Sequence, residues 1–143
     1  MLRFLKTLLG WKTAVDAGGQ GEQLAAEWLR RERSFAIIAR NWRSPRDRRE
    51  EIDLVCRDAE VMVFVEVKAR AAGALVPGYF AVDWRKKRVL RRAIEAYLAQ
   101  LRQRPHSFRF DVVEVVFPAA GATAAPEIRH FENVPLFSKY FRT

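Results

Sequence analysis

Apolar positions recur at the spacing of an α-helix in two segments of the chain. The first segment runs from Gly21 to about Arg33, and the glycine-containing residues 16–20 before it predict a flexible break. The second runs to about Gln103 and begins after Asp83, a residue suited to the N-cap of a long helix. We therefore expect two amphipathic helices, each with one apolar face packed against a core.

The segments between and after these helices are rich in β-branched and aromatic residues and predict strands. A turn near residues 58–60 would join two of them as a hairpin. The order helix, three strands, helix, then one or two strands predicts an α/β fold with a mixed central sheet and helices against its faces. The expected strands are residues 35–42, 51–57, 61–69, 108–117 and a short edge strand, 128–131.

Acidic residues interrupt the two hairpin strands. Side chains of a strand alternate between its faces, so Glu51 and Asp53 share one face of their strand, and Glu66 and Lys68 share one face of theirs. A hairpin loop of two or four residues would put Asp53 and Glu66 on the same face of the sheet. A three-residue loop would separate them, unless a bulge restored the phase.

Two carboxylates with a lysine beside them suit metal-dependent hydrolysis of a phosphodiester. Asp53 and Glu66 could ligate Mg²⁺ or Mn²⁺, since both metals prefer oxygen ligands, and the carbonyl of Val67 could add a third ligand. Lys68 could orient or deprotonate a water molecule, or place positive charge against the phosphoryl group. The structural alternative is an exposed Glu66–Lys68 ion pair, with Asp53 on a solvated face. We favour catalysis, because the apolar Phe64 shares the charged face.

Further charged residues could assist this site. Glu22, in the first turn of the first helix, could be another metal ligand or hold a water molecule, although a carboxylate there also favours the helix dipole. Lys86, in the first turn of the second helix, could reach a substrate phosphate. The loop before the Asp53 strand is strongly basic and suits contacts with nucleic-acid phosphates, unless it is simply a solvated loop. Its arginines are Arg43, Arg46, Arg48 and Arg49.

Composition narrows the setting and the partner. The 143 residues are half apolar and carry 26 basic against 17 acidic side chains, a net charge of +9 that favours nucleic acid as a partner. Cys56 is the only cysteine, which excludes an intrachain disulfide and suits a reducing cytoplasm. His106 and His130 are too few for a histidine-rich metal cluster and are expected at the surface or an edge.

The two ends of the chain differ from the middle. Residues 1–17 form an apolar arm with interspersed basic residues, but no apolar run reaches the length of about 20 residues that a membrane helix needs. We therefore favour an arm without a membrane partner, and a membrane-associated adaptor that uses this arm is the alternative. Residues 18–135 would form the nuclease-like domain. The aromatic tail, residues 136–143, would pack back on the domain or contact a partner.

Several motifs in order carry a family resemblance over about residues 18 to 117. They are Gly21-Glu22-Gln23, Arg40-Asn41-Trp42, Glu51-Ile52-Asp53-Leu54-Val55, Phe64-Val65-Glu66-Val67-Lys68, the helix lysine Lys86 or its alternative Lys87, and Arg109-Phe110-Asp111-Val112-Val113. The chain resembles the YraN family of predicted endonucleases, which have a restriction-endonuclease-like fold, and is more distantly similar to archaeal Holliday-junction resolvases.

The resemblance implies a role for each site residue. Asp53 and Glu66 would be the metal ligands, Lys68 the catalytic lysine and Glu22 an accessory acid. Glu50 departs from the family pattern, because glycine usually holds that place, so the turn into the strand must be built differently.

We therefore expect an endonuclease that cleaves DNA, more specifically branched or structured DNA, with Mg²⁺ or Mn²⁺. Recognition would depend on backbone and shape, since no sequence-reading module is evident. A homodimer would suit a symmetric junction, which takes two active sites. The alternative is a non-catalytic nucleic-acid-binding module that retains the nuclease fold.

Overall fold

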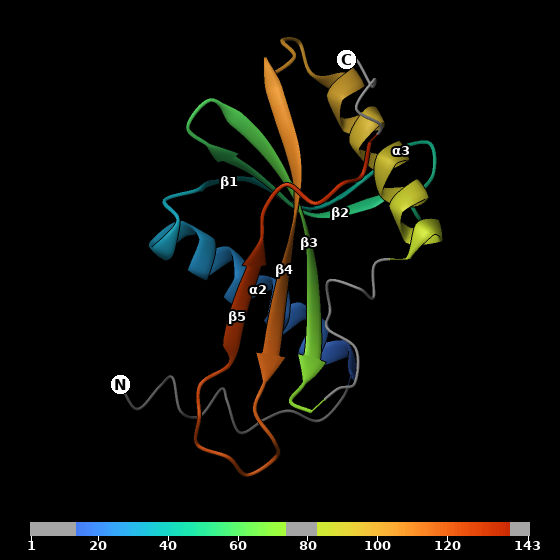
Figure 1. Ribbon diagram of the computed structural model, residues 1–143. Helices are drawn as coiled ribbons and strands as arrows, with labels where there is room; N and C mark the ends of the chain where they lie inside the picture. Colours follow the sequence, from blue (N-terminus) through green and yellow to red (C-terminus); the bar gives the residue numbers. More distant parts are fainter. Residues whose placement is uncertain (1–13, 74–82, 138–143) are drawn as a thin grey trace.

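The computed structural model describes residues 14–73 and 83–137. Within these residues it contains two helices and five strands, in the order that the hydrophobic pattern predicts (Figure 1). In chain order the elements are α2 (Ala14–Glu32), β1 (Ala36–Arg43), β2 (Glu51–Asp58), β3 (Val61–Ala71), α3 (Trp84–Gln100), β4 (Ser107–Phe117) and β5 (Glu127–Phe131).

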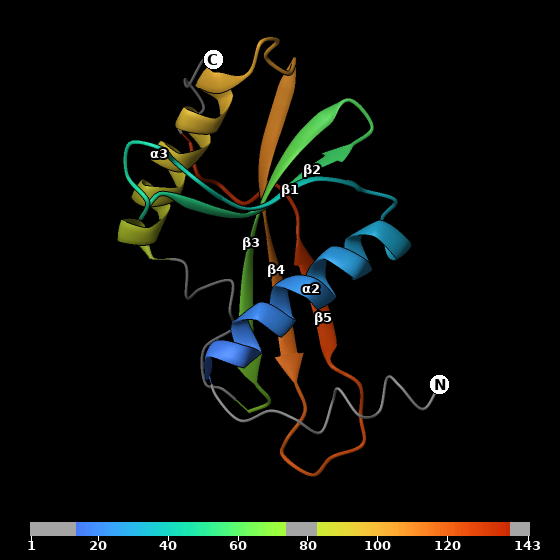
Figure 2. The same cartoon turned by 180° about the vertical axis from the view of Figure 1, so that it is seen from behind.

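The five strands form one mixed sheet with the order β1-β2-β3-β4-β5. Strands β3 and β4 are parallel and are connected through α3, whereas every other neighbouring pair is antiparallel. The helices cover opposite faces: α3 lies in front of the sheet in Figure 1, and α2 crosses the strands behind it, as Figure 2 shows. This arrangement confirms the expected α/β fold of the restriction-endonuclease-like class.

Each face of the sheet has its own hydrophobic core. Leu90 and Ile94 of α3 pack over Phe64 and other apolar residues of the sheet in one cluster. Ala25 and Leu29 of α2 belong to a second cluster on the other face. Because side chains alternate along a strand, neighbouring residues of β3 and β4 contribute to different clusters. In β3 and β4, an even or odd residue number therefore decides whether the side chain faces α3 or α2.

Helix α2 corrects one prediction. It begins at Ala14, so residues 16–20 continue the helix and the expected flexible break is wrong. Glycine weakens a helix by about 1 kcal/mol relative to alanine, a cost that packing of the helix against the sheet can outweigh. The expected division at residue 18 consequently falls inside a helix. The rest of the arm, residues 1–13, lies outside the described residues.

Helix α3 confirms its predicted start and shortens its predicted end. Asp83 is the N-cap, and its carboxylate accepts a hydrogen bond of 2.9 Å from the backbone N–H of Lys86. The helix ends at Gln100 rather than near Gln103, because Leu101 has an extended conformation and caps the last turn with its N–H on the Leu98 carbonyl. Of the loop expected before this helix, residues 74–82 lie outside the described part.

The hairpin of β2 and β3 has the short loop that keeps the acidic residues together. Asp58 pairs directly with Val61, so the loop consists of Ala59 and Glu60. Ala59 has a φ of 51°, the left-handed conformation common in two-residue hairpin loops. Among the loop lengths considered from sequence, this one puts Asp53 and Glu66 on the same face.

The C-terminal segment packs onto the domain as far as it is described. Leu136 is buried in the α3-side core, and the ring of Phe137 lies 5.5 Å from that of Phe108. Residues 138–143 of the expected tail lie outside the described residues. In the described part of the chain, neither helix has the length and apolar character that crossing a membrane requires.

Candidate active site

The candidate site lies where β2 and β3 stop pairing. Their ladder runs from the turn to Leu54 and Val65, and the next residues along the strands are Asp53 and Glu66. At this point the backbone N–H of Val67 donates a 2.8 Å hydrogen bond to Oδ2 of Asp53 instead of to a strand carbonyl. The N–H and C=O of one strand residue point towards the same neighbour, so the Val67 carbonyl also faces this gap.

Glu66 is a buried carboxylate that is only half satisfied. Its side chain is 3% exposed, and Oε1 lies 3.0 Å from Nζ of Lys68 and 3.4 Å from Nζ of Lys86. Its other oxygen, Oε2, is buried without any hydrogen-bond partner. An unpaired buried carboxylate oxygen is costly, so Oε2 of Glu66 is chemically suited to accept a positively charged ligand.

Asp53 also has too little positive charge nearby to stabilise its ionised form. Burial, followed by the negative charge of Glu66, raises the pKa of Asp53 from 3.8 to about 8. The hydrogen bond from Val67 and the charge of Lys86 oppose this shift only in part. Two carboxylates that repel each other, at the point where β2 and β3 stop pairing, fit a divalent cation that prefers oxygen ligands, such as Mg²⁺ or Mn²⁺. The residues present therefore fit the expected metal.

Glu22 approaches this site through a close contact between α2 and β3. A Cβ on Gly21 would lie 2.9 Å from the Cβ of Ala69, so only glycine lets the helix come this near. Burial raises the pKa of Glu22, and the charges of Glu51 and Glu66 act in the same direction. The described residues nevertheless contain no group of three metal-ligating side chains. This arrangement favours the water-holding role of Glu22 over direct ligation.

Asn41 is a site residue whose role the sequence pattern did not predict. Its neighbours in β1, Arg40 and Trp42, pair with Leu54 and Ile52, so Asn41 lies opposite Asp53. Its φ of 49° is left-handed, which is uncommon for a residue other than glycine. The side chain hydrogen-bonds the carboxylate of Glu22. Apart from its match to the family motif, nothing in the strand pattern marks this position.

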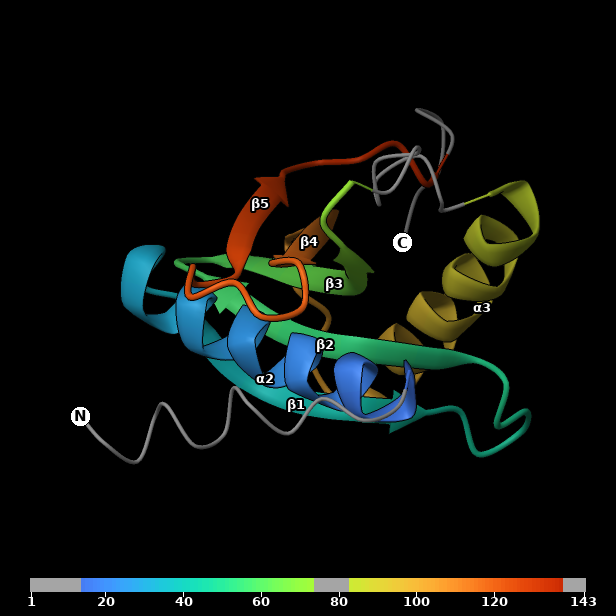
Figure 3. The ribbon, with the colours of Figure 1, turned by 90° about the horizontal axis from the view of Figure 1, so that it is seen from below.

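Among the predicted basic contacts, Lys86 is the one that reaches the acidic centre, and Lys87 makes no such contact. In the basic loop, Arg43 pairs with Glu51 at 3.4 Å and Arg49 with Asp47 at 2.9 Å. Arg46 and Arg48 make no ion pair with a described residue. Figure 3 shows this loop extending beyond the sheet on the side of α3. At Glu50, which replaces the family glycine, the N–H donates to the Asp47 carbonyl, and φ is not positive.

A second buried acidic centre lies on the opposite, α2 side of the sheet. Asp111 of β4 is fully buried and accepts hydrogen bonds from Nε of Arg109 at 3.0 Å, from Nε2 of His130 at 2.8 Å and from the N–H of Asn133 at 2.9 Å. Nη1 of Arg109 also pairs with Asp58 at 3.1 Å. The His130 side chain is 2% exposed, so the predicted surface position is wrong, although β5 is an edge strand. Nothing in the sequence pattern predicted this network.

Glu114 of β4 is a third buried acid. Its Oε1 pairs with Nε of Arg70, whereas its Oε2 is buried without a partner. It lies opposite Lys68 in the parallel ladder, on the α3 side of the sheet. No spacing or motif in the sequence distinguished it from a surface glutamate.

The fold and the acidic centre define an α/β domain of the restriction-endonuclease-like class with two carboxylates and two lysines at the gap between β2 and β3. Comparison with known sequences gives the family. The chain belongs to the uncharacterised protein family UPF0102, whose profile matches residues 21–115, and this confirms the YraN family expected from the motifs.

Bacterial relatives match over most of their length. A UPF0102 protein of Geobacter metallireducens is 40% identical over 81% of this chain and 88% of its own. One from Anaeromyxobacter dehalogenans is 44% identical over 80% and 79%. One from Symbiobacterium thermophilum is 47% identical over 68% and 80%. The names of these relatives state no activity, so the roles of Asp53, Glu66, Lys68 and Glu22 stay predictions.

Proposed function

We propose that this protein is an endonuclease that hydrolyses phosphodiester bonds in DNA with Mg²⁺ or Mn²⁺, and that its substrates are branched or otherwise structured DNA. The observation that carries the proposal is the environment of Glu66. Its buried carboxylate has two lysines beside Oε1 and no hydrogen-bond partner at Oε2. A binding module would gain nothing from holding Glu66 and Asp53 together beside a phosphate, because both repel it. The enzyme would act in the cytoplasm.

Each residue of the centre then has a role. Asp53 and Glu66 would hold the metal, with the Val67 carbonyl facing the same gap. When bound, the metal would supply positive charge at phosphorus and a more acidic water. Lys68, which already lies 3.0 Å from Glu66, would orient the water or neutralise charge that develops on the phosphoryl oxygens. Glu22, held by Asn41, would fix a water molecule at the rim.

The surface around the centre favours a polyanion. Lys86 extends from the first turn of α3 to Glu66, and the basic segment with Arg43, Arg46, Arg48 and Arg49 precedes β2. These groups would contact backbone phosphates, which position DNA without reading its sequence. A symmetric junction would require two such sites, and we propose a homodimer for that substrate.

The test is cleavage of labelled four-way junction, flap, single-stranded and duplex DNA in Mg²⁺, Mn²⁺ or EDTA. Wild type is compared with Glu66→Gln, which keeps the shape but loses the charge, and with Glu95→Gln, a matched change at an exposed position of α3. We expect metal-dependent cutting by wild type and Glu95→Gln, and loss of cutting by about a thousandfold in Glu66→Gln. DNA binding without cutting, equal in all three proteins, would favour the non-catalytic module.

A further inference from the structure

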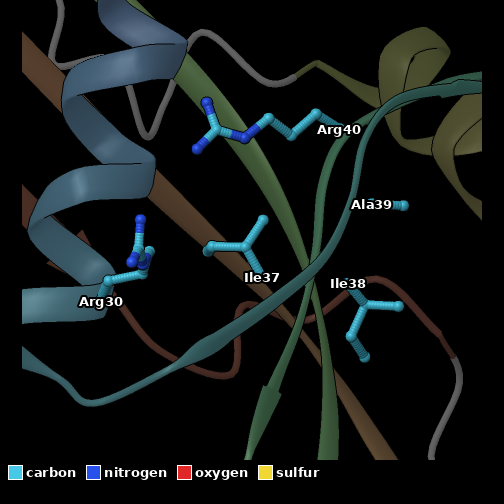
Figure 4. Close-up of a pocket in the computed structure, with 5 residues that line it drawn as sticks. All are labelled: Arg30, Ile37, Ile38, Ala39 and Arg40. Carbon is cyan, nitrogen blue, oxygen red and sulfur yellow. The ribbon is translucent and has the colours of Figure 1, made fainter.

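A cleft outside the acidic centre lies between α2 and the edge strand β1. It has a volume of about 450 Å³ and is lined by Arg30 of α2 and by Ile37, Ile38, Ala39 and Arg40 of β1. Figure 4 shows Ile37 and Arg40 extending from β1 towards the side on which Arg30 projects from the helix, whereas Ile38 points away. Of the residues that line the cleft, Arg30, Ile37 and Arg40 have side chains on its side of the strand, so one apolar side chain lies between two arginines.

The shape of β1 opens this cleft. The pairing of β1 with β2 shifts between Ile37 and Ala39, so Ile38 has no partner in the ladder and is 46% exposed. Such a bulge bends its strand and increases the local twist. The irregular part of β1, residues 37–40, is the part of the strand that lines the cleft.

The charges that line the cleft are all of one sign. None of its lining residues is acidic, and neither Arg30 nor Arg40 forms an ion pair with a described residue. Two guanidinium groups that line one cleft repel each other, and an anion bound between them would offset this repulsion. The guanidinium is also the group best suited to bidentate contact with a phosphate. The chemistry of the cleft therefore fits a phosphodiester oxygen pair.

The cleft and one residue of the candidate active site, Glu22, lie along the same helix, α2. Arg40 directly precedes Asn41, whose side chain holds Glu22. Along α2, Glu22 and Arg30 are eight residues apart (30 − 22), which corresponds to about 12 Å of helix. A DNA strand advances about 3.4 Å per nucleotide, so this length corresponds to three or four nucleotides.

We propose that the cleft between α2 and β1 binds a backbone phosphate of the DNA substrate, about three to four nucleotides from the bond that is cut. This inference rests on the proposed function and extends it: a strand that leaves the acidic centre follows the groove between the helix and the edge strand. The enzyme would then hold its substrate on the α2 side as well as through the basic loop.

The experiment is DNA binding in EDTA, where no cutting occurs, over a series of salt concentrations. The variants are Arg30→Ala and Arg40→Ala, with Arg31→Ala as the matched control, an exposed arginine on the same helix that does not line the cleft. Each lost phosphate contact should reduce the slope of log K against log [salt] by about 0.9 and weaken binding roughly three- to tenfold at fixed salt. Arg31→Ala should bind like wild type.

The outcomes separate this inference from the proposed function. If wild type cuts DNA but Arg30→Ala and Arg40→Ala keep its salt slope, the cleft is not a phosphate site and the nuclease proposal stands. An equal loss in Arg31→Ala would also overturn the inference, since general charge would explain it. Wild type that neither binds nor cuts DNA would refute the proposed function itself. Arg40→Lys should retain the salt slope, because it keeps the charge, and this checks that the alanine effect is electrostatic.

Discussion

The two buried acidic centres on opposite faces of the sheet differ in how far their oxygens are satisfied. On the α2 side, both oxygens of Asp111 accept hydrogen bonds from Arg109, His130 and the Asn133 backbone. On the α3 side, Oε2 of Glu66 has no partner, and Asp53 adds a second carboxyl group whose pKa burial and Glu66 raise. A satisfied buried carboxylate stabilises the fold, whereas an unsatisfied one is maintained at a cost and indicates a site.

The pKa values express the same difference. Burial alone would raise the pKa of Asp111, but hydrogen bonds from His130, Arg109 and the Asn133 N–H outweigh it and lower that pKa. At Asp53, burial and the charge of Glu66 dominate and raise the pKa to about 8. The contacts of Glu114 lie between these two cases, because Arg70 pairs with one of its oxygens and no second acid lies beside it in the ladder. A lone unpaired oxygen is thus weaker support for a metal site than a pair of acids.

The largest expected contrast is in stability. Asp111→Ala should lower the free energy of unfolding by about 3 to 5 kcal/mol, because it leaves the buried Arg109 and His130 without their acceptor. Glu66→Gln should have a smaller effect, about 1 kcal/mol or less, because the lost charge is buried with one oxygen unpaired and its partners Lys68 and Lys86 are partly exposed. Urea unfolding of both variants measures the two effects. A larger loss in Glu66→Gln than in Asp111→Ala would reverse the assignment of the centres.

The second-largest contrast between the two centres should be in metal binding. Mg²⁺ or Mn²⁺ at a hundred times its dissociation constant should stabilise the wild-type fold by about 2.7 kcal/mol. The same addition should have no effect on Asp53→Asn, which lacks one of the two carboxylates. Thermal unfolding with and without metal checks this, and Glu127→Gln, a change at an exposed glutamate of β5, is the control. Equal stabilisation of all three proteins would place the ion elsewhere.

Much of the molecule could be predicted from local patterns. Segments rich in β-branched and aromatic residues predicted all five strands to within two residues at their ends, and Asp83 marked the start of α3. Because Glu66 and Phe64 are two residues apart in one strand, the alternation of side chains placed both on the same face of the sheet. The hairpin loop length was the remaining ambiguity, because sequence did not distinguish a two-residue turn from a three-residue one.

The parts that could not be predicted depend on tertiary contacts. Residues 16–20 contain two glycines and suggested a break, yet the helix continues through them. The place of Asn41 follows from its register opposite Asp53 and a left-handed φ, neither of which leaves a periodic signal. The Asp111 network requires β5 to pair antiparallel with β4, which brings His130 next to Asp111 from 19 residues away.

Gly21 should show how far the α3-side centre depends on the approach of α2. Gly21→Ala should lower the free energy of unfolding by about 1 to 3 kcal/mol, because the new methyl group would overlap the Ala69 side chain. Gly19 in the same helix has no atom within 4 Å of the corresponding position, so Gly19→Ala should stabilise the protein by up to about 1 kcal/mol. Chemical unfolding of the pair measures the contrast, and equal effects would show that the contact at Gly21 does not position Glu22.

The dependence of stability on pH should be opposite in sign at the two centres. Native Asp53 keeps its proton up to a pH of about 8, whereas the unfolded chain releases it near 3.8. Between these values the native state binds more protons, so the stability of the metal-free protein should fall as pH rises, by at most about 1.4 kcal/mol per pH unit. Asp111, whose pKa is lowered, contributes stability above its ordinary pKa and loses it as pH falls through the native value. Urea unfolding in EDTA at pH 5, 6 and 7 should therefore give a downward slope that Asp53→Asn removes and Asp111→Asn retains. A slope that survives in Asp53→Asn would assign the proton to another group and weaken the argument that repulsion between Asp53 and Glu66 prepares the site for a cation.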